Sequence, residues 1–278
     1  MKTRIITSVV AVCILLPALY FSGTVVFCVA LAAVTVISLF EMMKCIGVKK
    51  LYISIPVYAF GIISPFLLRY LDNKVTFAVI SFIFTSAYLM YLFTITITSH
   101  GAFKFSDAAT VFTVSLYIIT ALNSIIYVRD FGNYGKYVYI LIFLGAWITD
   151  IFAYFTGVLL GKHKLIPDVS PKKTIEGSIG GIVFCSLSFV IFGIITDSFF
   201  GTDANIVLLA IGGIIISIFS QIGDLIMSVI KRHYGIKDYG KIFPGHGGML
   251  DRFDSILAVS LGVAVMCMFT SVTGIKIM

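Results

Sequence analysis

Hydrophobic residues form nine long stretches along the chain, separated by short polar segments. A helix needs about 20 apolar residues to cross the hydrocarbon core of a bilayer. The stretches that qualify or nearly qualify are residues 5–22, 24–40, 51–68, 75–97, 108–128, 137–160, 179–196, 206–230 and 255–272. Strands of a membrane β-barrel alternate apolar and polar residues and would not give such unbroken runs. The pattern therefore predicts an all-α integral membrane protein with about nine transmembrane helices.

The first stretch has a second interpretation, because it follows Lys2 and Arg4 and could be a signal peptide. Its apolar run is long for the hydrophobic region of such a peptide, and no small-x-small cleavage site follows it. We therefore predict a transmembrane helix here.

Composition and charge support a membrane protein and suggest its orientation. Of the 278 residues 59% are hydrophobic and 12% are charged, against roughly 25% charged residues in soluble domains. With nine spans and a cytoplasmic N-terminus, the cytoplasmic segments hold 15 Lys and Arg residues and the opposite segments hold 5. Cytoplasmic loops typically carry such an excess. The net charge of +7 is thus explained by orientation, and no nucleic-acid partner is predicted. The five cysteines share no metal-ligand spacing, and we predict neither disulfide nor metal for them.

Two carboxylates lie inside predicted spans, where a charge costs at least a few kcal/mol. Asp150 lies well inside the span 137–160, and Asp224 lies shortly before the span 206–230 ends. Either could make a helix–helix hydrogen bond or a buried ion pair with a loop lysine. An apolar residue would serve structure at lower cost, so we predict a function for both.

The polar loop 161–178 contains a predicted helix start. Ser170 is a candidate N-cap and Pro171 suits the first helical position. Lys172 and Lys173 would then lie in the first turn, which opposes the helix dipole but favours binding of an anion. Alternatively, the two lysines are positive anchors at the membrane interface.

The polar loop 231–254 has the highest density of acidic, basic and glycine residues. Asp251 and Asp254 are three residues apart and would share one face of a helix. With Asp224 they would form a site of three carboxylates suited to Mg²⁺, a cation commonly held by carboxylates and substrate phosphates. The loop's basic residues are numerous enough to bind a nucleoside triphosphate: Lys231, Arg232, Lys237, Lys241 and Arg252.

The segment 244–248 of the same loop predicts a flexible turn whose backbone N–H groups come close to a ligand. It contains His246, Gly247 and Gly248. For Lys237 we prefer the role of an interfacial anchor, and for His246 a structural hydrogen bond and a chemical role stay equal alternatives.

The C-terminal half resembles the phosphatidate cytidylyltransferases, also called CDP-diacylglycerol synthases. The residues that match this family's signature are Ser228-x-x-Lys231-Arg232-x4-Lys237-Asp238-x4-Phe243-Pro244-x-His246-Gly247-Gly248-x-x-Asp251-Arg252-x-Asp254. The stretches 147–162 and 170–177 resemble the family's second conserved region. In the N-terminal half the resemblance rests on topology alone.

The resemblance implies transfer of CMP from CTP to the phosphate of phosphatidate, which gives CDP-diacylglycerol and pyrophosphate in phospholipid biosynthesis. It implies a divalent metal at Asp224, Asp251 and Asp254, with Mg²⁺ as the expected ion and Mn²⁺ or a second cation as alternatives. It also implies a homodimer and a polar active-site cavity that opens to the cytoplasm. The absence of a long hydrophilic N-terminal extension favours a bacterial plasma membrane.

These considerations assign roles to named residues. The predicted catalytic residues are Asp224, Asp251, Asp254, Lys231 and Arg252. The predicted substrate-binding residues are Asp150, Ser170, Lys172, Lys173, Lys231, Arg232, Lys241, His246, Gly247 and Gly248. Asp150 would complete a second cation site or orient a lysine. We predict an N-terminal domain, residues 1–136, that acts as scaffold with the dimer contacts, and a C-terminal domain, residues 137–278, with the catalytic loops 161–178 and 231–254.

Two other functions are compatible with parts of the pattern. A CTP-dependent lipid kinase could use a similar site, but it would transfer the γ-phosphate and release CDP. A cation-coupled secondary transporter would also place Asp150 and Asp224 inside the bilayer. It would not need the dense loop of basic residues and glycines.

Overall fold

The structure is a computed structural model that describes residues 13, 16–245 and 247–278. Within these residues, eight helices are long and apolar enough to cross a membrane. They confirm the prediction of an all-α integral membrane protein. The predicted first span, residues 5–22, lies largely outside the described residues.

The chain divides into two compact units, which are described separately. Unit 1 comprises Met1–Ile126 and Asp238–Asp251, and unit 2 comprises Tyr127–Lys237 and Arg252–Met278. The predicted domain boundary at residue 136 lies within unit 2. The helices of unit 1 are α2 (Val25–Cys45), α3 (Leu51–Tyr70), α4 (Lys74–Thr98) and most of α5 (Phe105–Arg129). The elements of unit 2 are α6 (Gly135–Val138), α7 (Ile140–Leu160), β1 (Lys164–Ile166), β2 (Ser170–Thr174), α8 (Ile175–Phe200), α9 (Ile206–His233) and α10 (Leu250–Thr273), whose first two residues belong to unit 1.

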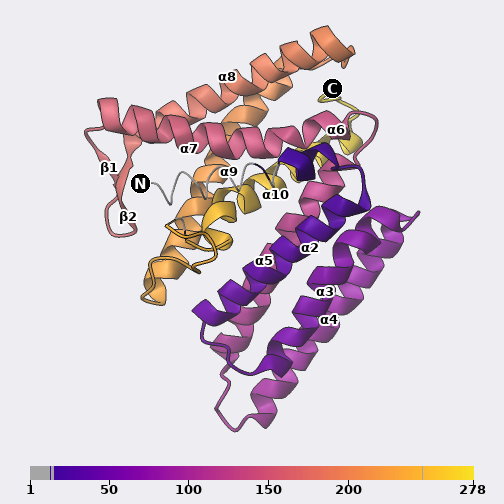
Figure 1. Ribbon diagram of the computed structural model, residues 1–278, viewed down its shortest axis with the longest axis vertical. Coiled ribbons are helices and arrows are strands. Elements are labelled where there is room, and N and C mark those ends of the chain that lie inside the picture. Colours follow the sequence, from indigo (N-terminus) through magenta and orange to yellow (C-terminus); the bar gives the residue numbers. More distant parts are fainter. Residues whose placement is uncertain (1–12, 14–15, 246) are drawn as a thin grey trace. The chain divides into compact units, whose positions relative to one another are not determined.

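Helix α3 of unit 1 lies side by side with α2 and α4 (Figure 1). The Tyr88 hydroxyl on α4 donates a hydrogen bond of 3.0 Å to the Ile53 carbonyl on α3. The Asn123 side chain on α5 donates one of 2.8 Å to the Ser64 hydroxyl on α3. Such pairs provide hydrogen-bond partners to polar groups that lipid hydrocarbon could not provide.

In unit 2, small residues let α7, α8 and α9 pack closely. A Cβ atom on Gly213 of α9 would lie 2.6 Å from the Cα atom of Ser186 on α8. A Cβ atom on Gly145 of α7 would lie 2.6 Å from the Ile216 side chain on α9. Without a hydrophobic driving force between helices in lipid, this close contact of backbones is a main source of helix association.

A two-stranded antiparallel hairpin, β1 and β2, connects α7 to α8 (Figure 1). The predicted helix start at Ser170 and Pro171 is therefore wrong: both residues lie in β2, and α8 begins at Ile175. The φ angle of proline also suits an edge strand, and Thr174 is a competing N-cap of the same chemical class. Its hydroxyl accepts a hydrogen bond of 3.1 Å from the Gly177 N–H.

The close contact of α8 and α9 can be tested with adjacent glycines. Gly213→Ala should lower the free energy of unfolding in detergent by about 1–3 kcal/mol, because its methyl group meets backbone atoms. The matched control is Gly212→Ala, whose methyl group would meet only the end of the flexible Met266 side chain, at 2.9 Å. Since Ala favours a helix more than Gly does, the control should be unchanged or more stable. Equal destabilisation of both variants would contradict this account.

Candidate active site

Unit 2 brings three predicted site carboxylates together from three helices. Asp150 lies on α7, Asp224 on α9 and Asp254 on α10. Electrostatic interactions link Asp150 to Asp224, and Asp254 to both. Gly223 permits the approach of α9 to α10 here, because a Cβ atom on it would lie 2.5 Å from that of Ala258. We call the three aspartates the acidic cluster.

Cations surround the acidic cluster and offset its mutual repulsion. The Lys173 ammonium, on β2, lies 2.5 Å from the Asp224 carboxylate, and both side chains are half-buried. Lys231 interacts electrostatically with Asp254, and Arg252 interacts with Asp150. Three carboxylates and three cations from different parts of the sequence therefore interact in pairs.

Ser255 on α10 orients two members of the acidic cluster. Its hydroxyl donates a hydrogen bond of 3.1 Å to Asp150, and its backbone N–H donates one of 2.9 Å to Asp254. The Ser255 side chain is buried. Sequence reasoning missed this residue, although it directly follows the last aspartate of the matched motif.

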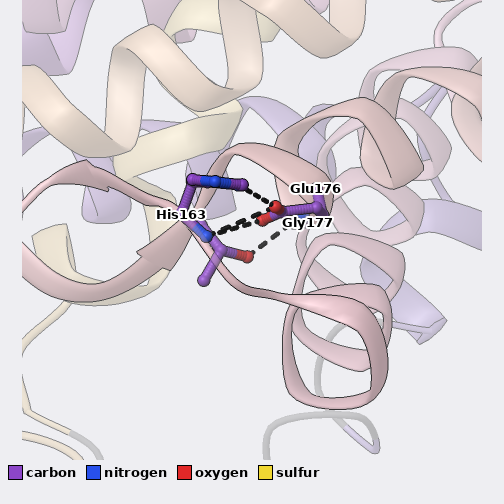
Figure 2. Close-up of polar contacts among 4 residues, drawn as sticks. His163, Glu176 and Gly177 are labelled. Atoms are coloured by element: carbon purple, nitrogen blue, oxygen red, sulfur yellow. Dashed lines mark hydrogen bonds and ion pairs between the residues drawn. The ribbon is translucent and has the colours of Figure 1, made fainter.

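The β1–β2 hairpin that carries Lys173 is fixed to the first turn of α8 (Figure 2). The Nδ1 atom of His163 lies 2.7 Å from a carboxylate oxygen of Glu176, and the His163 backbone N–H donates to both oxygens of that carboxylate at 3.3 Å. Thr174 caps the same turn through Gly177. Because Lys173 directly precedes this cap, these contacts restrict where its ammonium can lie.

In unit 1, backbone N–H groups of the polar loop 231–254 bind the Asp251 side chain. One oxygen of this buried carboxylate accepts hydrogen bonds of 2.8 Å from the backbone N–H groups of Tyr239 and Gly248. Gly247 has a φ of +87°, and a Cβ atom there would lie 2.7 Å from the same oxygen. We call residues 238–249 the glycine loop. Asp251 and Asp254 both lie in α10, which confirms the predicted helix.

Glu41, on α2, is a further acidic residue of this part of unit 1 that sequence reasoning missed. Its carboxylate accepts hydrogen bonds from the backbone N–H groups of Met249 at 3.0 Å and Leu250 at 2.9 Å. Only 3% of its surface is exposed. The sequence did contain a clue, since Glu41 is an acidic residue directly after the predicted span 24–40. In the structure α2 continues through it to Cys45.

The other predicted site residues differ in their exposure to solvent. The exposed ones are Lys172, Arg232, Lys241 and Arg252, while Ser170, Lys231 and Gly247 are half-buried and Gly248 is buried. The Arg232 guanidinium donates a hydrogen bond of 3.4 Å to the Ile236 carbonyl. His246 lies outside the described residues.

The three carboxylates of the acidic cluster have the donor chemistry for a divalent cation but are not arranged to hold one ion together. Carboxylate oxygens are the donors that Mg²⁺ prefers. Among the described residues, however, no group of three or more His, Cys, Asp or Glu side chains is arranged to hold one metal ion. Asp224 forms an ion pair with the Lys173 ammonium instead.

Comparison with known proteins identifies the family. The profile described as the cytidylyltransferase family matches residues 2–270. The chain belongs to this family. A phosphatidate cytidylyltransferase of Staphylococcus haemolyticus (strain JCSC1435) is 38% identical over 264 residues, which cover 93% of the chain and 96% of that relative. Phosphatidate cytidylyltransferases of Staphylococcus saprophyticus and Staphylococcus aureus (strain COL) are each 35% identical, with the same coverage. The resemblance carried by the two motif regions is thereby confirmed.

The cap that fixes the hairpin of this cytidylyltransferase-family chain can be tested at Thr174. Thr174→Val keeps the branched shape but removes the hydroxyl that accepts the Gly177 N–H. We expect the free energy of unfolding to fall by about 1 kcal/mol, as for loss of other N-caps. Thr174→Ser keeps the hydroxyl and should remain close to the original stability. If denaturant titration of the two variants in detergent gave the same midpoint, the hydroxyl would have no capping role.

Proposed function

We propose that the chain catalyses transfer of the cytidylyl group from CTP to phosphatidate, with CDP-diacylglycerol and pyrophosphate as products. Family membership supports this activity, as do relatives of that name that match 93% of the chain. The observation that carries the assignment of the site is the contact of Lys173 with Asp224 inside the acidic cluster. It links the second conserved region, through Lys173, to Asp224, which lies four residues before the signature begins.

The reaction requires two polyanions to meet, and this requirement determines what the site must supply. The lipid phosphate already bears a nucleophilic oxygen, so no strong general base is needed. Positioning and neutralisation of charge are therefore the main contributions of the protein. In this proposal Lys172, Lys173 and Arg252 stabilise the pyrophosphate that leaves, and Lys231 and Arg232 hold the phosphatidate headgroup.

We further propose that Asp224 and Asp254 hold a divalent cation, with Mg²⁺ as the expected ion. Their donor chemistry supports this, since both offer carboxylate oxygens and lie within electrostatic range of each other. When bound, the cation would supply positive charge to the CTP phosphates. Asp150 is the neighbouring carboxylate for a second cation. The third ligand predicted from the sequence, Asp251, lies in unit 1 and stays a prediction.

We propose that the active site faces the cytoplasm of a bacterial cell and that the membrane is the plasma membrane. The excess of basic residues in the predicted cytoplasmic segments supports this orientation. The relatives from Staphylococcus support the bacterial membrane. The homodimer stays a prediction from the family resemblance.

Product analysis tests the proposed reaction. Purified protein in detergent receives phosphatidate, Mg²⁺ and CTP that is labelled at either the α or the γ phosphate. We expect the α label in the lipid and release of pyrophosphate. The γ label in the lipid would indicate a lipid kinase instead. If no lipid were labelled by folded protein, the proposed activity would be wrong, and a transport assay would be the next experiment.

The adjacent lysines of β2 provide a matched test of the site. Lys173→Met should lower kcat/KM by on the order of 10²-fold, because it removes a positive charge aimed at the acidic cluster. Lys172→Met removes the same charge from an exposed neighbour and should have a clearly smaller effect. Steady-state kinetics of both variants, corrected for folded protein, measures the difference. Equal losses would show that the contact with Asp224 does not distinguish the two lysines.

A further inference from the structure

Glu41 is a buried carboxylate in a membrane-spanning helix, far in sequence from either motif region. It lies on α2 in unit 1 with 3% of its surface exposed. A charge at such a position costs several kcal/mol unless it has hydrogen-bond partners or a countercharge. An apolar side chain would pack there without this cost, so the partners of Glu41 indicate what the charge does.

The partners of Glu41 are backbone N–H groups at the beginning of α10. Leu250, the first residue of α10, and Met249 before it each donate to one oxygen of the carboxylate, at 2.9 and 3.0 Å. The first N–H groups of a helix lack partners within the helix and carry partial positive charge. The side chain of Met249 has no oxygen to accept them. Glu41 therefore caps α10 from another helix, 209 residues away from Leu250 in sequence.

The glycine loop is shaped around the Glu41 carboxylate. A Cβ atom on Gly240 would lie 2.8 Å from the carboxyl carbon of Glu41, and one on Gly248 would lie 2.5 Å from it. The backbone N–H of Gly248 meanwhile donates to Asp251. Glu41 and Asp251 thus hold the same segment of the loop through two carboxylates, which explains why Gly240 and Gly248 have no side chain.

We propose that Glu41 is a positioning residue for the cytidylyl transfer: it fixes the start of α10 and the glycine loop, and through them the Asp251 carboxylate. The proposal deepens the proposed function and rests on it for the effect on catalysis. Glu41 itself need not touch a substrate. Its contribution should therefore be visible in the rate of the reaction rather than in substrate binding.

The first experiment compares Glu41→Gln with Met42→Ala in the full chain. Glu41→Gln keeps the shape but turns one acceptor into a donor that faces a backbone N–H. We expect kcat to fall by on the order of 10²-fold, as for other small misplacements of a site, with KM values close to wild type. Met42→Ala removes a fully buried neighbour on α2 and leaves the cap intact. It should lower stability while kcat per folded molecule stays unchanged.

Amide hydrogen exchange provides a measurement that does not depend on activity. In protein without substrates, residues 247–251 should exchange faster in Glu41→Gln than in wild type, and Met42→Ala should leave their exchange unchanged. If the wild-type protein produced no CDP-diacylglycerol, the proposed function would fail. Exchange would still show whether Glu41 holds the loop.

A second variant reaches the same contact from the loop side. Gly240→Ala places a methyl group against the Glu41 carboxylate and should also lower kcat. Combined with Glu41→Gln, its effect should be smaller than the product of the single effects, because both disturb one contact. If Glu41→Gln did not fold, Gly240→Ala alone would test the proposal through its kcat and its exchange. Wild-type kcat in either variant would overturn the positioning role. The same would follow if Met42→Ala unexpectedly lowered kcat per folded molecule as much as these variants do.

Discussion

A carboxylate within a membrane-spanning helix must find a partner inside the protein, and this constraint determines how the loops of this chain are held. Glu41 accepts N–H groups from the start of α10, Asp150 accepts the Ser255 hydroxyl, and Asp224 pairs with Lys173. In each case the partner comes from a distant part of the sequence. Satisfying one carboxylate therefore helps to fix one segment in place.

Glu41 and Asp251 of unit 1 are satisfied by different means from Asp224 of unit 2, and the difference has chemical consequences. In unit 1 the partners are backbone N–H groups, which cannot be exchanged without unfolding the glycine loop. In unit 2 the partner of Asp224 is the ammonium of Lys173, on a flexible side chain that is 27% exposed. Such a pair can open when another cation approaches the carboxylate or an anion approaches the lysine. Unit 1 thus offers fixed geometry, and the acidic cluster offers charges that can respond to a ligand.

Hydropathy predicted the helices well, because a span is defined by its own residues; the site was only partly predictable. Asp150 and Asp224 stood out as charges inside apolar runs, but their mutual interaction was not predicted. The start of α8 was misplaced, since local propensity does not distinguish Ser170 from Thr174 when a hairpin intervenes. Glu41 was overlooked because it lies one position beyond an apolar run, and its partners are 208 and 209 residues away. Contacts at such distance depend on tertiary packing.

The long separation between Glu41 and its partners also has a consequence for biosynthesis. Synthesis proceeds from the N-terminus, so α2 is complete long before residues 238–250 leave the ribosome. During that interval the Glu41 carboxylate has none of the loop N–H groups that it accepts in the finished protein. Until the last helix is made, this carboxyl group has to be satisfied by water, by another partner or by protonation. Closure of the glycine loop is accordingly one of the final steps in the maturation of this chain.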